Sequence, residues 1–150
     1  MTHSKIQMFT DGSCLNNPGP GGWAALLRHN NKEKIFSGCM SETTNNQMEL
    51  MAVIEGLKVL KKPCDIELFS DSKYVIDGFT KWMDGWKKRN WKKSDKKPVL
   101  NQELWKQLDK NAIGHNINWH WVKGHSGHPE NERVDQVARQ EAENLKAEQV

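Results

Sequence analysis

The most constraining feature of the sequence is a short apolar run that ends in an aspartate and a glycine. The run Ile6-Gln-Met-Phe-Thr-Asp11-Gly-Ser13 carries no charge before Asp11. This pattern predicts a central β-strand that is buried on both faces. A carboxylate at the exit of such a strand is costly to remove from water unless something pairs with it. Asp11 is therefore the first candidate for chemistry.

A second run repeats this arrangement further along the chain. Ile66-Glu-Leu-Phe-Ser-Asp71-Ser72 is an apolar stretch followed by a small hydroxyl residue, an aspartate and another small residue. Two strands that end in aspartate could place both carboxylates at one edge of one sheet. The alternative is that each aspartate only caps a turn, as aspartate often does.

Composition limits the kind of protein this can be. With 150 residues the chain is most simply one domain, residues 1–150, long enough to bury about two-thirds of its unfolded surface. No apolar run approaches the ~18 residues of a membrane span, and the first residues lack the apolar region of a signal peptide. The three cysteines, Cys14, Cys39 and Cys64, indicate neither a disulfide framework nor a thiolate metal site. We therefore expect a soluble, unexported protein of the reducing cytoplasm.

The positive charge is concentrated in one segment. The net charge is +3, but residues 87–97 hold seven of the 22 Lys and Arg residues against one acid, Asp95. That segment carries +6, which leaves −3 for the remainder of the chain. A concentrated charge of this kind indicates a polyanion as partner.

The first half of the chain predicts three strands and a helix. Residues 12–22 are rich in glycine, proline and asparagine and predict a loop. Residues 23–28 and 35–40 read as an antiparallel hairpin with a polar tip at 29–34. A helix is expected over residues 47–60, with Asn46 as its N-cap and Lys61-Lys62-Pro63 as its stop.

The second half predicts helices between two further strands. Ser72 is expected to cap a helix whose apolar side chains share one face; these are Val75, Phe79, Trp82, Met83 and Trp86. A helix around 104–108, a strand over 117–122, a loop over 124–128 and a closing helix follow. The order β-β-β-α-β-α-α-β-α predicts an α/β (layered α+β) fold with a mixed sheet covered by helices.

Two further acids are candidates to join the strand-end aspartates. Glu49 lies in the first turn of the expected 47–60 helix, three residues after Asn46. That spacing also fits a capping box, in which a glutamate accepts a backbone N–H. Asp135 lies at the apolar edge of the last helix, where it could equally be a solvated surface residue.

Convergence of these four acids would restrict the chemistry. Two unit charges ~4 Å apart repel by roughly 4 kcal/mol at an effective dielectric near 20, so such a cluster either holds protons or binds cations. An all-oxygen ligand set selects Mg²⁺ or Mn²⁺ over zinc. Two such ions ~3.5–4 Å apart can activate a water and stabilise a leaving 3′ oxygen during in-line attack on a phosphodiester.

Several blocks of the sequence together resemble the signature of bacterial type 1 ribonuclease H. The blocks are Asp11-Gly-Ser-Cys, Thr44-Asn-Asn-Gln-Met-Glu49-Leu, Ser70-Asp-Ser72 and Trp121-Val-Lys-Gly-His125-Ser-Gly-His-Pro-Glu-Asn-Glu-Arg-Val-Asp135. The resemblance implies a ribonuclease H-like fold, a five-stranded mixed sheet with helices on both faces. It also implies hydrolysis of RNA in RNA–DNA hybrids, which leaves 5′-phosphate and 3′-hydroxyl ends.

The resemblance assigns expected roles to individual residues. By position, Asp11, Glu49, Asp71 and Asp135 match the metal-binding carboxylates of the family. His125 matches its mobile-loop histidine, which is thought to assist proton movement or product release. An ordinary histidine pKa near 6.5 suits proton exchange at neutral pH, although a histidine between glycines is often only a polar turn residue. We treat His125 as auxiliary.

Three asparagines near the carboxylates are expected to read the RNA strand. Only one strand of a hybrid exposes 2′-hydroxyls in its wide minor groove. Asn17, Asn45 and Asn46 suit that recognition and match family residues that contact RNA riboses, with help from the backbone around Cys14. Their alternative roles are turn formation for Asn17 and helix capping for the other two.

The basic segment around 86–98 is interleaved with tryptophans. It resembles the family's basic protrusion, which holds the DNA strand of the hybrid. The alternative is a solvated charged surface, and Trp82 and Trp86 also fit core spacing. The residues expected to bind nucleic acid here are Trp82, Trp86, Lys87, Lys88, Arg89, Trp91, Lys92 and the more distant Trp105.

Three positions depart from the family pattern. Glu42 stands where many relatives carry a basic residue at a DNA-phosphate pocket, and Gly85 stands where a side-chain amide often helps there. Thr44 of that pocket remains. Lys73 replaces a commonly neutral residue beside the active site and could compensate in part.

The sequence therefore predicts a monomeric, Mg²⁺-dependent endoribonuclease that acts on RNA–DNA hybrids. Mn²⁺ is the expected substitute ion, with two ions per site when substrate is bound. One alternative is a related two-metal nuclease that acts on DNA, which the 2′-hydroxyl-reading asparagines argue against. The other is a non-catalytic hybrid-binding module, which the four-carboxylate set argues against.

Overall fold

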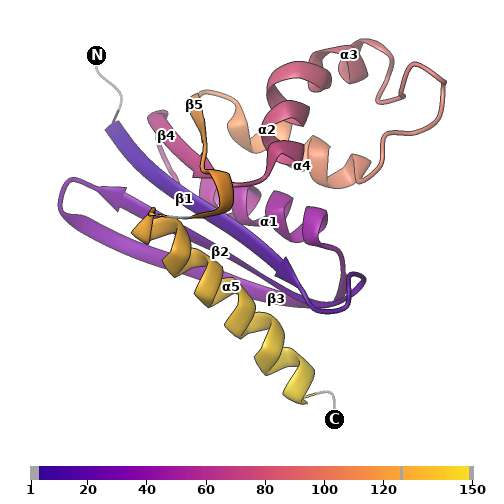
Figure 1. The fold of residues 1–150 in the computed structure, drawn as a ribbon. Coiled ribbons are helices and arrows are strands. Elements are labelled where there is room, and N and C mark those ends of the chain that lie inside the picture. Colours follow the sequence, from indigo (N-terminus) through magenta and orange to yellow (C-terminus); the bar gives the residue numbers. More distant parts are fainter. Residues whose placement is uncertain (1–3, 126, 149–150) are drawn as a thin grey trace.

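The frame of the molecule is one five-stranded sheet in the order β3-β2-β1-β4-β5 (Figure 1). The computed structural model describes residues 4–125 and 127–148, without the side chain of His125. The strands are β1 (Ser4–Cys14), β2 (Gly19–His29), β3 (Lys32–Thr43), β4 (Cys64–Ser70) and β5 (Asn116–Trp121). β1, β2 and β3 pair antiparallel, whereas β4 is parallel to both β1 and β5. The predicted mixed sheet is confirmed.

Helices cover both faces of this sheet. They are α1 (Asn45–Lys58), α2 (Lys73–Asp77), the π-helical turn η1 (Gly78–Trp82), α3 (Met83–Lys88), α4 (Gln102–Ala112), the 3-10 turn η2 (Lys123–His125) and α5 (Pro129–Glu148). α1 packs on β1 and β2 with α4 beside it, and α5 lies across β1, β2 and β3 on the other face (Figure 1). Among the described helices, none combines the length and the apolar character that crossing a bilayer requires.

The central strand β1 is buried on both faces, as its apolar run predicts. Met8 belongs to the apolar cluster under α1, and Phe9 belongs to the cluster under α5. Neither side chain is more than 2% exposed. Burial of a side chain of this size stabilises the fold by about 1.5–3 kcal/mol. β1 is therefore fixed firmly in the middle of the molecule.

The predicted loop over residues 12–22 is wrong. β1 continues through Cys14 and β2 already begins at Gly19, so only four residues turn the chain. Gly22 faces the backbone of α5 at Ala138, where an added Cβ would collide with the helix. The glycine is thus a strand residue at a close approach between backbones. The hairpin is likewise longer than predicted, because β2 and β3 extend to its two-residue tip at 30–31.

The N-cap of α1 is Thr44, which corrects the prediction of Asn46. The Thr44 hydroxyl accepts a hydrogen bond from the Gln47 N–H at 3.2 Å. The helix therefore starts at Asn45 and takes both asparagines into its first turn, where both are exposed. Because Thr44 supplies the cap, the side chains of Asn45 and Asn46 are not needed for it.

The helical stretch after β4 is interrupted by a π-helical turn, which changes which side chains face the core. Ser72 is the N-cap of α2, as predicted, and accepts from the Val75 N–H at 3.2 Å. Val75 and Met83 are buried, but Trp82 is 46% exposed. A π-turn holds more residues than an α-turn, so it changes the helical phase: Met83 keeps its predicted place in the core, and Trp82 does not. The core-face spacing is wrong for Trp82, and its predicted contact with nucleic acid stays a prediction.

Candidate active site

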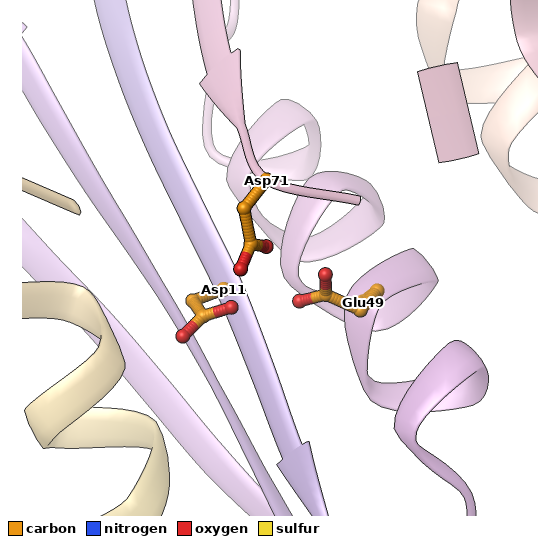
Figure 2. A group of neighbouring side chains, drawn as sticks. All are labelled: Asp11, Glu49 and Asp71. Carbon is orange, nitrogen blue, oxygen red and sulfur yellow. The ribbon is translucent and has the colours of Figure 1, made fainter. Parts of the chain in front are cut away.

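Two parallel central strands bring Asp11 and Asp71 together. β1 and β4 pair in register, with Phe9 opposite Phe69, so each aspartate lies two residues beyond a paired phenylalanine. Asp71 directly follows β4, but Asp11 lies inside β1 rather than at its exit, because β1 continues to Cys14. The predicted meeting of the two carboxylates is confirmed (Figure 2).

Glu49 reaches the same place from α1. Its Oε1 accepts a hydrogen bond from the backbone N–H of Gly12. Gly12 makes this approach possible, because a Cβ there would collide with the backbone of Met48 and Glu49. The glutamate thus binds the backbone of the neighbouring strand, and the capping-box role is not the one observed.

The three carboxylates form one compact cluster. Asp11, Glu49 and Asp71 each offer an oxygen, and these oxygens lie within 4.8 Å of one another. Figure 2 shows the three side chains pointing toward a common point from β1, α1 and the end of β4. Asp11 is only 2% exposed. Three hard oxygen donors at this spacing suit a small divalent cation such as Mg²⁺ or Mn²⁺.

The surroundings make full ionisation of the cluster unfavourable. Burial raises the pKa of Asp11 to about 9; its hydrogen bond with Glu49 opposes the rise, and the charges of Asp71 and Asp135 add to it. Burial likewise raises the pKa of Glu49 well above its usual range, with further contributions from Asp11 and Asp71. A bound divalent cation would favour the ionised acids, so the residues present fit a metal.

Asp135 lies beside this cluster but outside its closest group. It extends from α5 and lines the same cavity of about 430 Å³ as the other three acids. One helical turn later, Arg139 forms an ion pair with Asp135 at 2.8 Å. All four predicted carboxylates therefore line one cavity. Three of them, Asp11, Glu49 and Asp71, are close enough to bind the same metal ion.

The proposed RNA-reading residues border the cavity. Asn45 and Asn46 line it from the first turn of α1. The side-chain oxygen of Asn17 accepts the backbone N–H of Asn45 at 3.1 Å, which brings Asn17 to the same rim. The Cys14 thiol donates to the carbonyl of Thr43 at 3.2 Å, next to the cap residue Thr44. Lys73 also lines the cavity.

The side chain of His125 lies outside the described residues. Its backbone ends the short turn η2, directly after Gly124. The expectation for this histidine therefore stays a prediction.

The basic segment leaves the body of the protein between α3 and α4 (Figure 1). Lys87 pairs with Asp109 at 3.1 Å, whereas Lys88 and Lys92 have no carboxylate partner within the described part of the chain. The residues here expected to bind nucleic acid are exposed at Trp82, Lys87, Lys88, Arg89 and Lys92 and half-buried at Trp86 and Trp91.

Trp105 is not available to nucleic acid. Its side chain is fully buried, and its ring packs edge-on against Trp86 with centroids 5.2 Å apart. A Cβ on Gly78 would collide with the same ring. The predicted contact of Trp105 with the substrate is therefore wrong, and the residue supports Trp86 from the core side.

A hydrogen-bond network beside the cavity was not predicted from the sequence. The Tyr74 hydroxyl accepts from the Asn101 amide and from the Trp105 indole N–H, each at 3.1 Å. The Asn101 side-chain oxygen accepts from Gln47 at 3.1 Å. This network joins the starts of α1, α2 and α4. The sequence offered one hint of a special role for Tyr74, since it is the single tyrosine of the chain.

A larger hollow of about 530 Å³ lies at the opposite ends of the central strands. Several of its polar groups hydrogen-bond to one another: Asn118 donates to Glu67 at 3.1 Å, and Arg28 donates to Gln7 at 3.3 Å. The cluster of three carboxylates suited to a metal ion lies in the smaller cavity, which is therefore the candidate active site.

The fold and the site together define a class of protein, one in which carboxylates at the centre of a mixed sheet form a cluster suited to divalent cations. The RNase H family model matches residues 3–143. The chain is 56% identical to the ribonuclease H of Rhizobium meliloti (strain 1021), over 94% of this chain and 92% of that protein. It is 60% identical to the ribonuclease H of Bradyrhizobium sp. (strain ORS 278), over 89% and 87% of the two chains.

Solved structures agree with these sequence comparisons. LC9-RNase H1, a type 1 RNase H with the type 2 active-site motif, matches with a TM-score of 0.88 and 29% identity, over 97% of this chain and 75% of that chain. LC11-RNase H1 in complex with an RNA/DNA hybrid shares the fold with a TM-score of 0.70 and 21% identity, over 93% and 97% of the two chains. The chain belongs to the ribonuclease H family, whose members hydrolyse the RNA strand of RNA–DNA hybrids.

Proposed function

We propose that this ribonuclease H is an endonuclease that cuts by in-line attack of water on a phosphodiester of the RNA strand. The products would be 5′-phosphate and 3′-hydroxyl ends, with no covalent enzyme intermediate. The observation that supports this proposal is the group of three carboxylate oxygens within 4.8 Å of one another. A site of this kind suits hydrolysis assisted by hard cations.

The carboxylates are the proposed metal ligands. Asp11 and Asp71 would hold the cations most directly, with Glu49 on the RNA side and Asp135 on the side of the attacking water. We propose Mg²⁺ as the ion, with Mn²⁺ as its substitute and two ions present when the hybrid is bound. Bound cations would activate the water and stabilise the leaving 3′ oxygen.

The protein fixes this site before substrate arrives. The Gly12 N–H holds the Glu49 carboxylate, so its position is set by the backbone of the central strand. Burial of Asp11 keeps bulk water away, which strengthens electrostatic interactions within the cavity. Preorganisation of this kind lowers the cost of reaching the transition state.

The asparagines are proposed to select RNA over DNA. Asn17, Asn45 and Asn46 lie at one rim and can donate and accept hydrogen bonds with 2′-hydroxyls. The backbone at Cys14 adds to this contact, and Thr44 contributes to the grip on a DNA phosphate. The exposed negative charge of Glu42 beside Thr43 would weaken that grip.

The basic protrusion is proposed to hold the DNA strand. Its exposed cations, Lys87, Lys88, Arg89 and Lys92, provide phosphate contacts that do not depend on base sequence. Trp82, Trp86 and Trp91 offer flat surfaces to the sugar–phosphate backbone. His125 would assist proton movement or product release as an auxiliary group.

We also propose that the chain acts as a monomeric, single-domain enzyme of the cytoplasm. Its three cysteines are free in the structure, and Cys39 is exposed. A free, exposed thiol fits a reducing compartment.

A cleavage assay on three substrates tests the proposal. Hybrid, duplex DNA and duplex RNA of one sequence are incubated with Mg²⁺ and, separately, with a chelator. We expect cleavage of the hybrid alone, in its RNA strand, and only with Mg²⁺. Cleavage of duplex DNA would support a two-metal DNA nuclease instead. Inactivity on the hybrid with both Mg²⁺ and Mn²⁺ would support a binding module without catalysis.

A further inference from the structure

Trp121 at the end of β5 contacts the backbone of a metal-site residue. β5 pairs with β4 so that Trp121 lies opposite Ser70, immediately before Asp71. The indole N–H of Trp121 donates to the Asp71 carbonyl at 3.1 Å. The side chain is nevertheless 46% exposed, so burial alone does not account for a tryptophan here.

The same indole also holds a cation. The Lys73 ammonium lies over the Trp121 ring, 4.2 Å from the ring centroid. Trp121 therefore touches both ends of the segment Asp71-Ser72-Lys73. Ser72 between them is fixed separately, because its N–H donates to the Ser70 hydroxyl at 3.0 Å.

The position of Lys73 is unusual for a lysine at an acidic cavity. Lys73 lines the cavity that also contains Asp11, Glu49 and Asp71. Within the described part of the chain, however, its ammonium forms no ion pair with a carboxylate. A cation over the face of a tryptophan ring is attracted by the negative potential of the ring. The ring therefore holds the ammonium at the rim of the cavity, away from the carboxylate oxygens that suit metal ions.

We propose that Trp121 is a positioning residue that acts through its two neighbours. Its ring keeps the Lys73 ammonium at the cavity rim, where it binds a phosphate of the nucleic acid next to the cleaved bond. Its N–H holds the Asp71 carbonyl and with it the start of the segment that carries the carboxylate. This inference rests on the proposed function, because the phosphate belongs to the proposed hybrid substrate.

Variants can separate these two actions. Trp121→Phe keeps a ring face but removes the N–H, Trp121→Leu removes both, and Lys73→Gln removes the cation. Lys32→Gln is the matched control, an exposed lysine near the tip of the β2–β3 hairpin. Should Trp121→Leu fail to fold by circular dichroism, Trp121→Gln, which suits an exposed position, takes its place.

The main measurement is hybrid affinity as a function of salt, in chelator so that nothing is cut. Removing one phosphate contact lowers the slope of log Kd against log salt concentration by about 1. We expect this loss, with a several-fold weaker Kd, in both Lys73→Gln and Trp121→Leu, and no further change in the double variant. Trp121→Phe and Lys32→Gln should keep the wild-type slope.

Turnover measures the second action. With Mg²⁺ and saturating hybrid, Trp121→Phe should lower kcat several-fold at an unchanged Kd, because only the hydrogen bond to Asp71 is lost. A wild-type salt slope in Trp121→Leu, or additive losses in the double variant, would overturn the role of the ring. An unchanged kcat in Trp121→Phe would overturn the role of the N–H.

Wild-type cleavage in the same experiments tests the proposed function separately. If the wild-type protein bound the hybrid with the Trp121-dependent slope but did not cut it, the catalytic proposal would fail and the role of the ring would stand.

Discussion

The carboxyl groups of Asp11, Glu49 and Asp71 lie so close together that they would repel one another strongly if all three were ionised. Two unit charges about 4 Å apart repel by roughly 4 kcal/mol at a dielectric near 20. The observed oxygens lie within 4.8 Å of one another, and burial raises the pKa of Asp11 to about 9. At neutral pH the metal-free cluster therefore keeps protons that a cation would displace.

The first prediction concerns the stability of the metal-free protein. Between its ordinary pKa of 3.8 and about 9, Asp11 binds more proton in the folded than in the unfolded state. Stability must therefore fall as pH rises through this range. In chelator, the stability of Asp11→Asn relative to the wild type should rise between pH 5 and pH 8, by up to about 4 kcal/mol.

Urea unfolding at the two pH values measures this difference. Adding Mg²⁺ should reduce the loss of wild-type stability at pH 8, because the cation binds the folded state. A wild-type protein equally stable at both pH values would contradict the account of the cluster.

A second prediction follows from the missing side chain of Gly12. A methyl group there would collide with the backbone of Met48 and Glu49. Gly12→Ala should therefore cost about 1–3 kcal/mol of stability, as overpacking usually does, and should lower cleavage because Glu49 is displaced. The control is Gly85→Ala in α3, whose Cβ would meet only the flexible Arg89 guanidinium at 3.3 Å. Equal stability losses in the two variants would refute the argument.

At the scale of elements, the strands of the sheet could be predicted from the sequence more accurately than the loops that connect them. The apolar runs before Asp11 and Asp71 predicted β1 and β4, and the two strands are parallel neighbours. The glycines of 12–22 led to the wrong prediction of a loop, because Gly22 is a strand residue packed against α5 rather than a turn residue. The local sequence around Gly22 does not show that α5, more than 100 residues later, packs against it.

The tryptophans show a second limit of sequence patterns. Trp105 was expected at the substrate and is fully buried, whereas Trp82, which also fitted the spacing of the core face, is 46% exposed. The π-helical turn at Gly78–Trp82 changes the helical phase, and the space above Gly78 is filled by the Trp105 ring. A pattern based on 3.6 residues per turn predicts neither the π-helical turn nor the filling of the space above Gly78.

The basic protrusion yields the third prediction. Lys88→Gln combined with Lys92→Gln should weaken hybrid binding and lower its salt slope by up to about 2, roughly 1 for each phosphate contact. The kcat at saturating hybrid should stay close to that of the wild type, because neither residue lines the carboxylate cavity. Lys5→Gln with Lys32→Gln removes the same charge elsewhere and serves as the control. Equal salt slopes in the two double variants would remove the protrusion from the binding surface.

At the scale of the whole molecule, the site is assembled from four separate elements. Asp11, Glu49, Asp71 and Asp135 come from β1, α1, the end of β4 and α5. The resemblance of short sequence blocks to the family identified all four. The Gly12–Glu49 hydrogen bond and the Tyr74–Asn101 network could not be predicted, because their partners are far apart in the sequence.

The central claim is that these carboxylates hold the cations that the reaction requires, while other surfaces bind the hybrid. The most direct test is Asp71→Asn, which removes one ligand charge and preserves side-chain size. Cleavage of a hybrid labelled in its RNA strand is measured with Mg²⁺, beside the Kd for the same hybrid in chelator. We predict a Kd within about threefold of the wild type, roughly 0.6 kcal/mol or less, and almost no cleavage. Cleavage at the wild-type rate would contradict the assignment.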